Sequence, residues 1–447
     1  MTSRSKYSSN DIHALLHEQL EAMLSECENV MDNAAYGQTI NNLDSFLLVE
    51  GRKFIREVLR QKLQERIRQI EAEKENKQCP KCKKKTIYRY QRSKTIVTAH
   101  DHIPLERTYR CCTPCEHPFF PVDTNIGLDK TYTHELKRLV SRCVGLGSYR
   151  LGEENLEELC QIHLSHTTIG KVAAETADEM EARLHNNPDI RKDFQEADGE
   201  TEVLIDGTII NTRNADGKQE YREAKIALAA KRECGESATA CEWATRELPE
   251  PTVTYVVTAI ESKEDFQKRV EAMRRFLGIG GITSALADGA VWIWSLIFMV
   301  FGKTSECLDI YHALENVSSC GKALYGSGQK FTEWLDRMRL VLLSEGFAGM
   351  ERELELLKMG LGSEERKPVD SLLEYLRNNS GRLTYFERLA AGRAIGSGQV
   401  EGACKNLIGK RLKQTKACWS VPQANKIAKI CAILYSGQWK NAWSRPT

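Results

Sequence analysis

The feature of this sequence that most constrains its fold is a pair of Cys-x2-Cys motifs in one short, basic segment. The first motif is Cys79–Cys82 and the second is Cys112–Cys115. Two such turns can place four thiolates around a tetrahedral Zn²⁺ ion. The 29 residues between the motifs exceed the common spacing of about 15–20, but the strand-like stretches TIYRYQ and LERTYR can fill a longer loop. We therefore predict a structural zinc ribbon over residues 77–130.

The ligand set of this ribbon has alternatives. Cys111 directly precedes Cys112 and can take its place, and His117 is a weaker substitute. Unliganded surface cysteines are the other interpretation, but two motifs in one β-rich segment are rarely a coincidence. The chain has fifteen cysteines and opens with the polar stretch MTSRSKYSSN. Because this opening is unlike a secretory leader, we expect a reducing, cytoplasmic location with thiols rather than disulfides.

Hydrophobic spacing divides the rest of the chain. Apolar residues recur at helical intervals before residue 76, strands and helices mix between 196 and 320, and helices dominate after Gly302. The longest apolar run, Ala290–Phe301, has twelve residues, too few for a bilayer core of about 30 Å, so no membrane partner is expected. The predicted regions are an N-terminal helical region (1–76), the zinc ribbon (77–130), a helical region (131–195), the first part of an α/β core (196–320), a helical insertion (321–390) and a final helix with a basic tail (391–447).

The charge is unevenly distributed along the chain. The totals nearly cancel, with 63 Lys and Arg against 62 Asp and Glu. Residues 77–94, however, carry eight basic and no acidic residues, and residues 402–447 carry nine basic and none acidic. Residues 152–200 hold thirteen acids against four bases. Two basic patches are therefore available for a polyanion, despite a net charge of only +1.

Three carboxylates stand at places where a chain can build a metal site. Asp206 in VLIDGT and Asp288 in ALADGA each follow an apolar strand, and Glu401 in GSGQVEGACKN lies on the first turn of a helix. Each has a simpler interpretation. Asp-Gly is a common turn signature, and Glu401 can pair with Lys405 four residues later.

Taken together, these motifs resemble those of the ISKra-type DDE transposases of bacterial insertion sequences. The resemblance covers roughly residues 77–440, and GSGQVE (396–401) is its most specific part. It departs from the family in the phase of the second cysteine motif and in Cys418 before Trp419. The matching segments are the two Cys-x2-Cys motifs, PFFPVDTNIGL (118–128), LSHTTIGKV (164–172), IDGT, LADGA, LDIYHALE (308–315), IGSGQVEGACKNLIGKRLKQ (395–414) and CWS (418–420).

This resemblance implies a ribonuclease-H-like α/β core with a helical insertion, and a catalytic triad of Asp206, Asp288 and Glu401. Such acids hold two Mg²⁺ (or Mn²⁺) ions roughly 3.5–4 Å apart, which clamp the attacking and leaving oxygens of a phosphodiester. Asp206 would bridge the ions, and the other two acids would hold one ion each. Asp309 and His312 share a helical face; an accessory role at the scissile phosphate and a buried or capping pair are equal alternatives.

DNA binding is predicted in three places. The segment LEELCQIHLSHTTIGKVAAETA resembles a helix-turn-helix, with Ser165 or Thr167 as the cap of its second helix. A helical hairpin that packs on the core is the alternative. The two basic patches suit contacts to the phosphate backbone. The candidate DNA-binding residues are Lys83, Lys84, Lys85, Arg89, Thr167, Thr168, Lys405, Lys410, Arg411 and Lys413.

The resulting hypothesis is a transposase that binds the terminal inverted repeats of double-stranded DNA, hydrolyses phosphodiester bonds at the ends and transfers the 3′-OH ends to target DNA. It would act in the cytoplasm at the nucleoid, as a homodimer or larger assembly on DNA. The alternative is a catalytically silent zinc-ribbon and helix-turn-helix regulator derived from a transposase. An ATPase is disfavoured because Ile297 occupies the upstream glycine position of a phosphate loop ending at Gly302-Lys303-Thr304.

Overall fold

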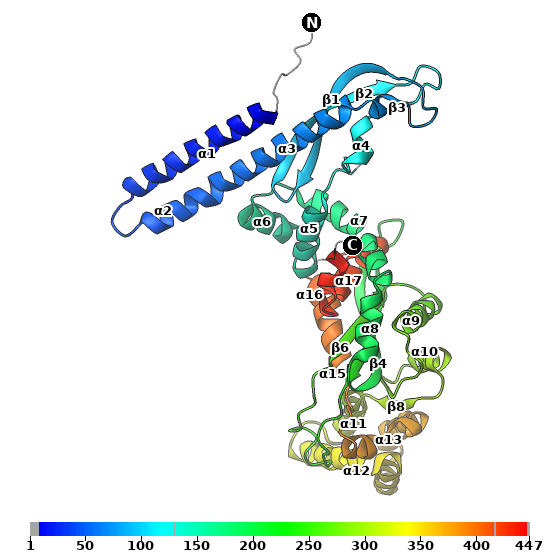
Figure 1. Ribbon diagram of the computed structural model, residues 1–447. Coiled ribbons are helices and arrows are strands. Elements are labelled where there is room, and N and C mark those ends of the chain that lie inside the picture. The colour runs from blue at the N-terminus through cyan, green and yellow to red at the C-terminus, as the bar shows by residue number, and fades with distance from the viewer. Residues whose placement is uncertain (1–8, 129, 415–416, 445–447) are drawn as a thin grey trace. The chain divides into compact units, whose positions relative to one another are not determined.

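The computed structural model describes residues 9–128, 130–414 and 417–444 (Figure 1). Most of the polar opening stretch lies outside these ranges. The chain forms two compact units: unit 1 comprises residues 1–144 and 148–173, and unit 2 comprises residues 145–147 and 174–447. Among the described residues, the helices are too short or too polar to span a bilayer.

Unit 1 begins with helices, as the apolar spacing predicts. Its helical elements are α1 (Ser9–Asp32), α2 (Thr39–Phe46), the π-helical turn η1 (Leu47–Gly51), α3 (Arg52–Ala72) and the 3-10 turn η2 (Glu75–Lys77). Helix α3 carries buried residues only in its second half, where Ile67 and Ile70 face the neighbouring sheet. The first half of α3 therefore contributes little to the apolar core.

An antiparallel hairpin follows, formed by β1 (Ile87–Thr98) and β2 (Asp101–Cys111), with the short β3 (Pro118–Phe119) paired to the end of β2. Along β2 the side chains of Ile103 and Leu105 are buried and those between them are exposed, the alternation that a strand with one covered face requires. Helix α3 covers this face, and α4 (Pro121–Asn125) supplies Val122 to the same core. The strands predicted for residues 77–130 are thus present.

Three further helices belong wholly or partly to unit 1: α5 (His134–Leu146), α6 (Tyr149–Cys160) and α7 (His166–His185). Helix α5 is separated from α6 at Gly147 and Ser148, and Ser148 caps α6 by accepting a hydrogen bond from the Leu151 N–H at 3.1 Å. The cap predicted at Ser165 also forms. The Ser165 hydroxyl accepts from the Thr168 N–H at 3.4 Å at the start of α7.

Unit 2 is built on a mixed six-stranded sheet in the order β6-β5-β4-β7-β8, with β9 paired to the end of β4. Strands β4, β5 and β6 are antiparallel, whereas β7 and β8 run parallel to β4. The middle of β5 and the whole of β7 are buried, as expected for strands covered on both faces. The strands are β4 (Glu200–Arg213), β5 (Gln219–Arg232), β6 (Val253–Ala259), β7 (Ser284–Ala287), β8 (Ser305–Leu308) and β9 (Trp419–Ser420).

Helices cover this sheet. The outer helices α8 (Pro188–Glu196), α9 (Lys263–Leu277) and α17 (Val421–Tyr435) contact β6, and α10 (Val291–Phe301) contacts β7. The helix α15 (Gly398–Ala403) and its π-helical continuation η4 (Cys404–Gly409) lie against β4. The short helices α16 (Lys410–Leu412) and α18 (Trp439–Trp443) complete the C-terminal part.

A helical insertion separates β8 from α15 (Figure 1). It consists of α11 (Ile310–Tyr325), α12 (Gln329–Met359), α13 (Ser363–Asn378), the 3-10 turn η3 (Ser380–Arg382) and α14 (Tyr385–Ala390), which pack on one another. Its far end is fastened to β8: Arg382 pairs with Glu306 at 2.6 Å, and the Tyr385 hydroxyl donates to the Leu308 carbonyl at 3.0 Å. The strand β8 itself is absent from the sequence-based assignment, which placed helix almost throughout after Gly302.

Candidate functional site

Two groups of potential metal ligands occur among the described residues. The first is the predicted set Cys79, Cys82, Cys112 and Cys115, whose sulfur atoms lie 3.4 Å (Cys82–Cys112), 3.5 Å (Cys79–Cys115) and 3.7 Å (Cys82–Cys115) apart. Four sulfurs at about 2.3 Å from one zinc ion would stand about 3.8 Å from each other. The spacing of these thiols therefore fits a tetrahedral ion without rearrangement.

The two cysteine turns have the same backbone geometry. The first cysteine of each turn donates its N–H to the carbonyl five residues later, Cys79 to Lys84 at 2.8 Å and Cys112 to His117 at 3.1 Å. The residue after the second cysteine has a positive φ in both, 60° at Lys83 and 52° at Glu116. The two turns therefore each contribute two thiols to the same group of four.

The choice between neighbouring ligands is resolved by this geometry. Cys112 belongs to the group, whereas the Cys111 thiol points to a backbone carbonyl 3.9 Å away and the His117 ring stacks on Phe119. Burial alone would raise the pKa of Cys79, but N–H groups of Cys82 and Lys81 and the neighbouring thiols lower it to about 7. A thiol with this pKa is readily available as a thiolate ligand, whereas burial raises the pKa of Cys112 to about 12.

The second region lies at one edge of the sheet in unit 2. Ile205 on β4 pairs with Ala287 on the parallel strand β7, so Asp206 and Asp288 follow at the same edge on adjacent strands. The turn interpretation holds only for Asp288, which follows the end of β7, because Asp206 lies within β4, which continues to Arg213. Asp206 Oδ1 accepts from the Gly207 N–H at 2.7 Å, and Asp288 Oδ1 accepts from the Ala290 N–H at 2.9 Å. These contacts orient the two carboxylates.

Glu401 reaches the same edge from a helix. The Cys404 thiol, one turn after Glu401 on α15–η4, donates a hydrogen bond to Asp206 Oδ2 at 3.1 Å. Residues three apart on a helix share a face, so the Glu401 side chain lies on the side of the helix that meets Asp206. Lys405 lies 3.9 Å from the Glu401 carboxylate, as the pairing interpretation expects, but its side chain is 79% exposed. This exposed pair leaves Glu401 available to other ligands.

Glu401 also meets Asp309 and His312, and potential ligand atoms of the three residues lie within 4.8 Å of one another. Asp309 is fully buried, and its two oxygens accept from the backbone N–H groups of His312, at 2.9 Å, and of Ser397. Asp309 therefore caps α11 and holds the loop before the Glu401 helix. Of the two alternatives for this residue, the capping role is the one observed; His312 remains partly exposed beside the site.

Burial raises the pKa of Asp288, and the nearby negative charges of Asp206 and Glu223 raise it further, against the lowering effects of the Ala290 N–H and of His312. The carboxylates of Asp206, Glu223 and Asp288 thus lie close enough to repel one another, and that of Asp288 is costly to ionise. Clusters of this kind are stabilised by cations and shift towards protonation without them.

This electrostatic cost predicts the effect of Asp288→Asn on the metal-free protein. Because the folded-state pKa is raised, the ionised carboxylate opposes folding above that pKa, so the variant should have a higher free energy of unfolding at pH 7. The gain should fade as the pH falls to the ordinary Asp value of about 3.9, and it can be measured by urea unfolding in chelator. Asp265→Asn is the control of opposite sign, since Lys268 and Ser262 lower the pKa of Asp265. A less stable Asp288→Asn protein at pH 7 would contradict the predicted clustering.

Three residues at this edge were not anticipated from the sequence: Glu223, Tyr375 and Cys404. Glu223 extends from β5 over Gly207, where an added Cβ would come within 2.3 Å of its carboxylate. Tyr375 belongs to the insertion, and burial together with Asp288, Asp309 and Glu315 raises its pKa to about 12. Only Cys404 could have been found from the sequence, because it lies three residues after Glu401 and so shares a helical face with it. The other two depend on strand register and on the packing of a distant helix.

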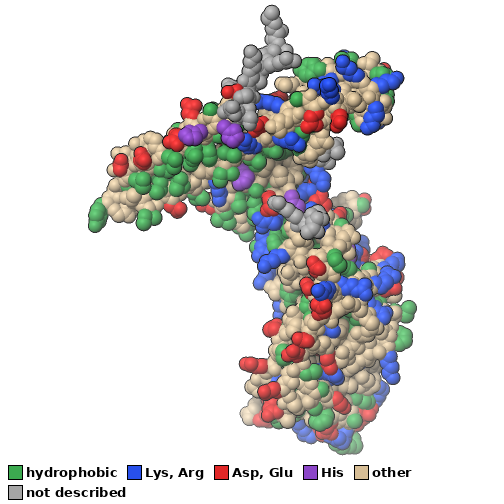
Figure 2. All heavy atoms as spheres, in the orientation of Figure 1, with side chains coloured by type: hydrophobic (Ala, Val, Ile, Leu, Met, Phe, Trp, Pro, Cys, Tyr) green, Lys and Arg blue, Asp and Glu red, His purple; other side chains and the backbone are tan. Residues whose placement is uncertain are grey.

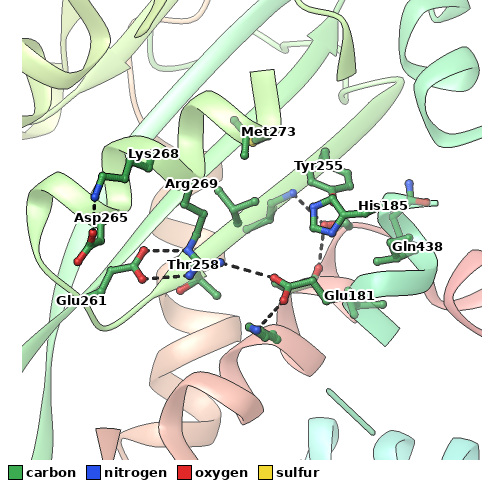
Figure 3. Close-up of a pocket in the computed structure, with 18 residues that line it drawn as sticks. Glu181, His185, Tyr255, Thr258, Glu261, Asp265, Lys268, Arg269, Met273 and Gln438 are labelled. Carbon is green, nitrogen blue, oxygen red and sulfur yellow. Dashed lines mark hydrogen bonds and ion pairs between the residues drawn. The ribbon is translucent and has the colours of Figure 1, made fainter. Parts of the chain in front are cut away.

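A separate cavity of about 460 Å³ in unit 2 is lined by residues of α7, β6, α9 and α17 (Figure 3). Its charged groups neutralise one another: Arg269 pairs with Glu261 at 2.8 Å and with Glu181 at 3.6 Å, and Lys429 pairs with Glu181 at 2.5 Å. None of the predicted acids lines this cavity. It therefore does not form part of the carboxylate site.

The DNA-binding candidates have mixed positions. Lys83, Lys84, Lys85 and Arg89 are exposed around the first cysteine turn and the start of β1, where Lys and Arg side chains gather at one end of unit 1 (Figure 2). Thr167 is exposed and Thr168 is half-buried on α7. In unit 2, exposed positions are occupied by Lys405, Lys410 and Lys413.

The prediction that Arg411 contacts DNA does not agree with its position. Its side chain is only 3% exposed, and its guanidinium lies 5.0 Å from the centre of the Trp419 ring. An arginine buried in this way stabilises the packing of the C-terminal segment and is not presented to DNA. The basic composition of residues 402–447 concealed this difference, since composition carries no information on which side of η4–α16 each residue lies.

Comparison with protein-family models gives no match to the chain, and a search of curated proteins finds none similar to it. Its function is therefore inferred from its own residues.

Proposed function

We propose that the chain is an ISKra-type DDE transposase, in which unit 2 is a ribonuclease-H-like catalytic core and Asp206, Asp288 and Glu401 are the catalytic acids. The observation that carries this proposal is the convergence at one sheet edge. Asp206 and Asp288 follow paired positions of adjacent parallel strands, and the Cys404–Asp206 hydrogen bond holds the Glu401 helix against them. A helical insertion stands between the second and third acids, as the resemblance to that family implies.

The donor set suits the proposed ions. Asp206, Asp288 and Glu401 offer carboxylate oxygens, which Mg²⁺ and Mn²⁺ prefer, and the raised pKa of Asp288 is relieved by a cation. Asp206 would hold two ions and the other acids one each. When bound, such ions activate the attacking oxygen and stabilise the leaving oxygen of a phosphodiester. His312 lies beside Glu401 and is placed to contribute an imidazole to the same ion or to its water.

The surrounding residues position these acids. The Gly207 N–H and the Cys404 thiol fix the two oxygens of Asp206, the Ala290 N–H orients Asp288, and Asp309 holds the loop that starts the Glu401 helix. Each acid is thus pre-oriented by a hydrogen bond or by a held backbone, as an electrostatic site requires. Zn²⁺ in the cysteine group would have a structural role in unit 1.

The test is cleavage of a labelled duplex that carries the inverted repeats flanking the gene. The full-length protein should nick this duplex at the repeat ends in Mg²⁺ and should join the 3′ ends to a second duplex. A duplex of scrambled repeats is the control. Tight binding to the repeats without any cleavage or joining, in Mg²⁺ or Mn²⁺, would reject the enzyme and favour the regulator derived from a transposase.

The basic patch of unit 1 should contribute affinity without selectivity. Changing Lys83, Lys84 and Lys85 together to alanine is expected to weaken binding to all DNA sequences alike, and to reduce the slope of log K against log salt by about 0.9 for each phosphate that the protein no longer neutralises. Fluorescence anisotropy over a salt series measures both effects. Lys53→Ala, which removes an exposed lysine already paired with Glu50 at 2.7 Å, is the matched control. A weakening confined to the repeat sequence would show that these lysines read bases instead.

A further inference from the structure

The helical insertion brings a tyrosine to the edge that carries the acids. Tyr375, on α13, stands over Gly289, the residue after Asp288. A Cβ built on Gly289 would lie 3.0 Å from the Tyr375 Cε2 atom and 3.2 Å from its hydroxyl oxygen. The absence of a side chain at Gly289 thus leaves room for the tyrosine ring directly beside the second acid.

The position of this ring is built into the fold. The neighbouring residues Leu372, Leu373 and Leu376 of α13 are buried, and the Asn379 amide at the end of the helix donates to the Tyr375 carbonyl at 3.0 Å. The turn that follows is anchored to β8 by the Arg382–Glu306 ion pair at 2.6 Å. The end of α13 that carries Tyr375 is therefore anchored to β8, the strand that directly precedes Asp309.

Among the residues that the structure describes, none forms a hydrogen bond with the Tyr375 hydroxyl. A tyrosine hydroxyl has an ordinary pKa of about 10 and is a donor at neutral pH. The charged groups that influence Tyr375, namely Asp288, Asp309 and Glu315, are all acidic. A neutral donor can stand among these acids without adding to their negative charge.

We propose that the Tyr375 hydroxyl binds a non-bridging phosphate oxygen of the nucleic-acid strand that is held at Asp288. This inference rests on the proposed function, because the acceptor is the phosphodiester on which the acids would act. The insertion would then complete the substrate site as well as separate the acids in sequence. Tyr375 would touch the substrate directly, whereas Asp309 and Cys404 act through the residues that they position.

The test measures binding and cleavage separately with the full-length protein and the repeat duplex. Ca²⁺ takes the same oxygen ligands as Mg²⁺ and serves to measure affinity, whereas Mg²⁺ is used for single-turnover cleavage. Tyr375→Phe should lower the Ca²⁺-supported affinity about tenfold, as loss of one hydrogen bond to a charged acceptor predicts. It should lower the cleavage rate about 10–100-fold. The Mg²⁺ concentration for half-maximal rate should stay unchanged, because the acids are intact.

Gly289→Ala supplies a second, independent variant. The added methyl group must displace the ring, so the same losses are expected in the wild-type background but little further loss in the Tyr375→Phe background. Tyr375→Leu separates packing from chemistry. If the Tyr375→Phe protein has wild-type affinity and cleavage rate and only Tyr375→Leu is impaired, Tyr375 merely fills space and the proposal is wrong.

The outcomes also separate this inference from the function on which it rests. Wild-type protein that neither cuts in Mg²⁺ nor gains affinity with Ca²⁺ would reject the proposed function, and the phosphate contact with it. Wild-type protein that does both, with Tyr375→Phe equal to it in affinity and rate, would reject the tyrosine contact alone. Additive losses in the Gly289→Ala, Tyr375→Phe double variant would likewise reject it.

Discussion

Replacing Asp206 with asparagine is expected to slow cleavage of the repeat duplex in Mg²⁺ by at least about a thousandfold. Asparagine can still accept from the Gly207 N–H, so β4 keeps its local shape. The lost charge, however, removes the ligand proposed to be shared by two ions, and a metal clamp contributes several kcal/mol to transition-state stabilisation. Asp288→Asn and Glu401→Gln should show comparable losses. Single-turnover cleavage over a Mg²⁺ series is the appropriate measurement.

The matched control is Asp216→Asn in the turn between β4 and β5. Asp216 is exposed in the loop that joins the strand of Asp206 to β5, so the variant changes an equal charge outside the site. Its cleavage rate should equal that of wild type. If the Asp206, Asp288 and Glu401 variants all cut like wild type, the assignment of the three acids is wrong, whatever else the protein binds.

The second large effect is expected at the cysteine group. Cys112→Ser should abolish stoichiometric zinc and unfold the segment from the first cysteine turn to β3. Ion binding by structural zinc sites is linked to folding by about 10–16 kcal/mol in small peptides, and the two cysteine turns contribute no side chain to the apolar cluster of Ile96, Ile103 and Leu105 under the hairpin. Zinc content of the purified protein, together with hydrogen exchange of residues 79–119 before and after chelation, measures the effect.

Cys111→Ser provides the control within the same pair of residues. The Cys111 thiol points to a backbone carbonyl and does not belong to the group of four. This variant should therefore keep full zinc content and wild-type exchange. The reverse result, with zinc lost in Cys111→Ser and kept in Cys112→Ser, would exchange the two ligands. Equal zinc content in both variants and in Cys79→Ser would contradict a metal site altogether.

Much of the local structure could be predicted from the sequence because local rules determined it. The cap at Ser165 followed from capping preferences, and its hydrogen bond from the Thr168 N–H forms. The two Cys-x2-Cys motifs determine their own turns, so the cysteine group was predictable even though its exact ligands were not. The choice of Cys112 over Cys111 required the hydrogen bond from the Cys112 N–H to the His117 carbonyl.

The remaining features depend on contacts between distant segments. Strand β8 has only four residues and lacks the length that distinguishes a strand from the start of a helix. Arg411 appeared in a basic run, but burial against Trp419 could not be inferred from charge. At the carboxylate site, each acid alone also suited a turn or a helical ion pair. Strand register brings Asp206 and Asp288 to adjacent strands, and the Cys404 contact brings the Glu401 helix to Asp206, whereas the ligand atoms of Glu401 group with those of Asp309 and His312.

The buried carboxylate of Asp309 also bears on how this chain can vary. It joins two points of the backbone 88 residues apart, and the Ile310 N–H donates to the Ile395 carbonyl next to it at 3.1 Å. The chain thus leaves the sheet edge at Asp309 and returns to it at Ser397 through adjacent backbone positions. Adding residues to a loop whose ends are already joined costs little free energy. Lengthening the loop 360–362 between α12 and α13 should therefore leave the acids in place, whereas changes at Tyr375, Arg382 or Tyr385 would disturb contacts with the sheet edge.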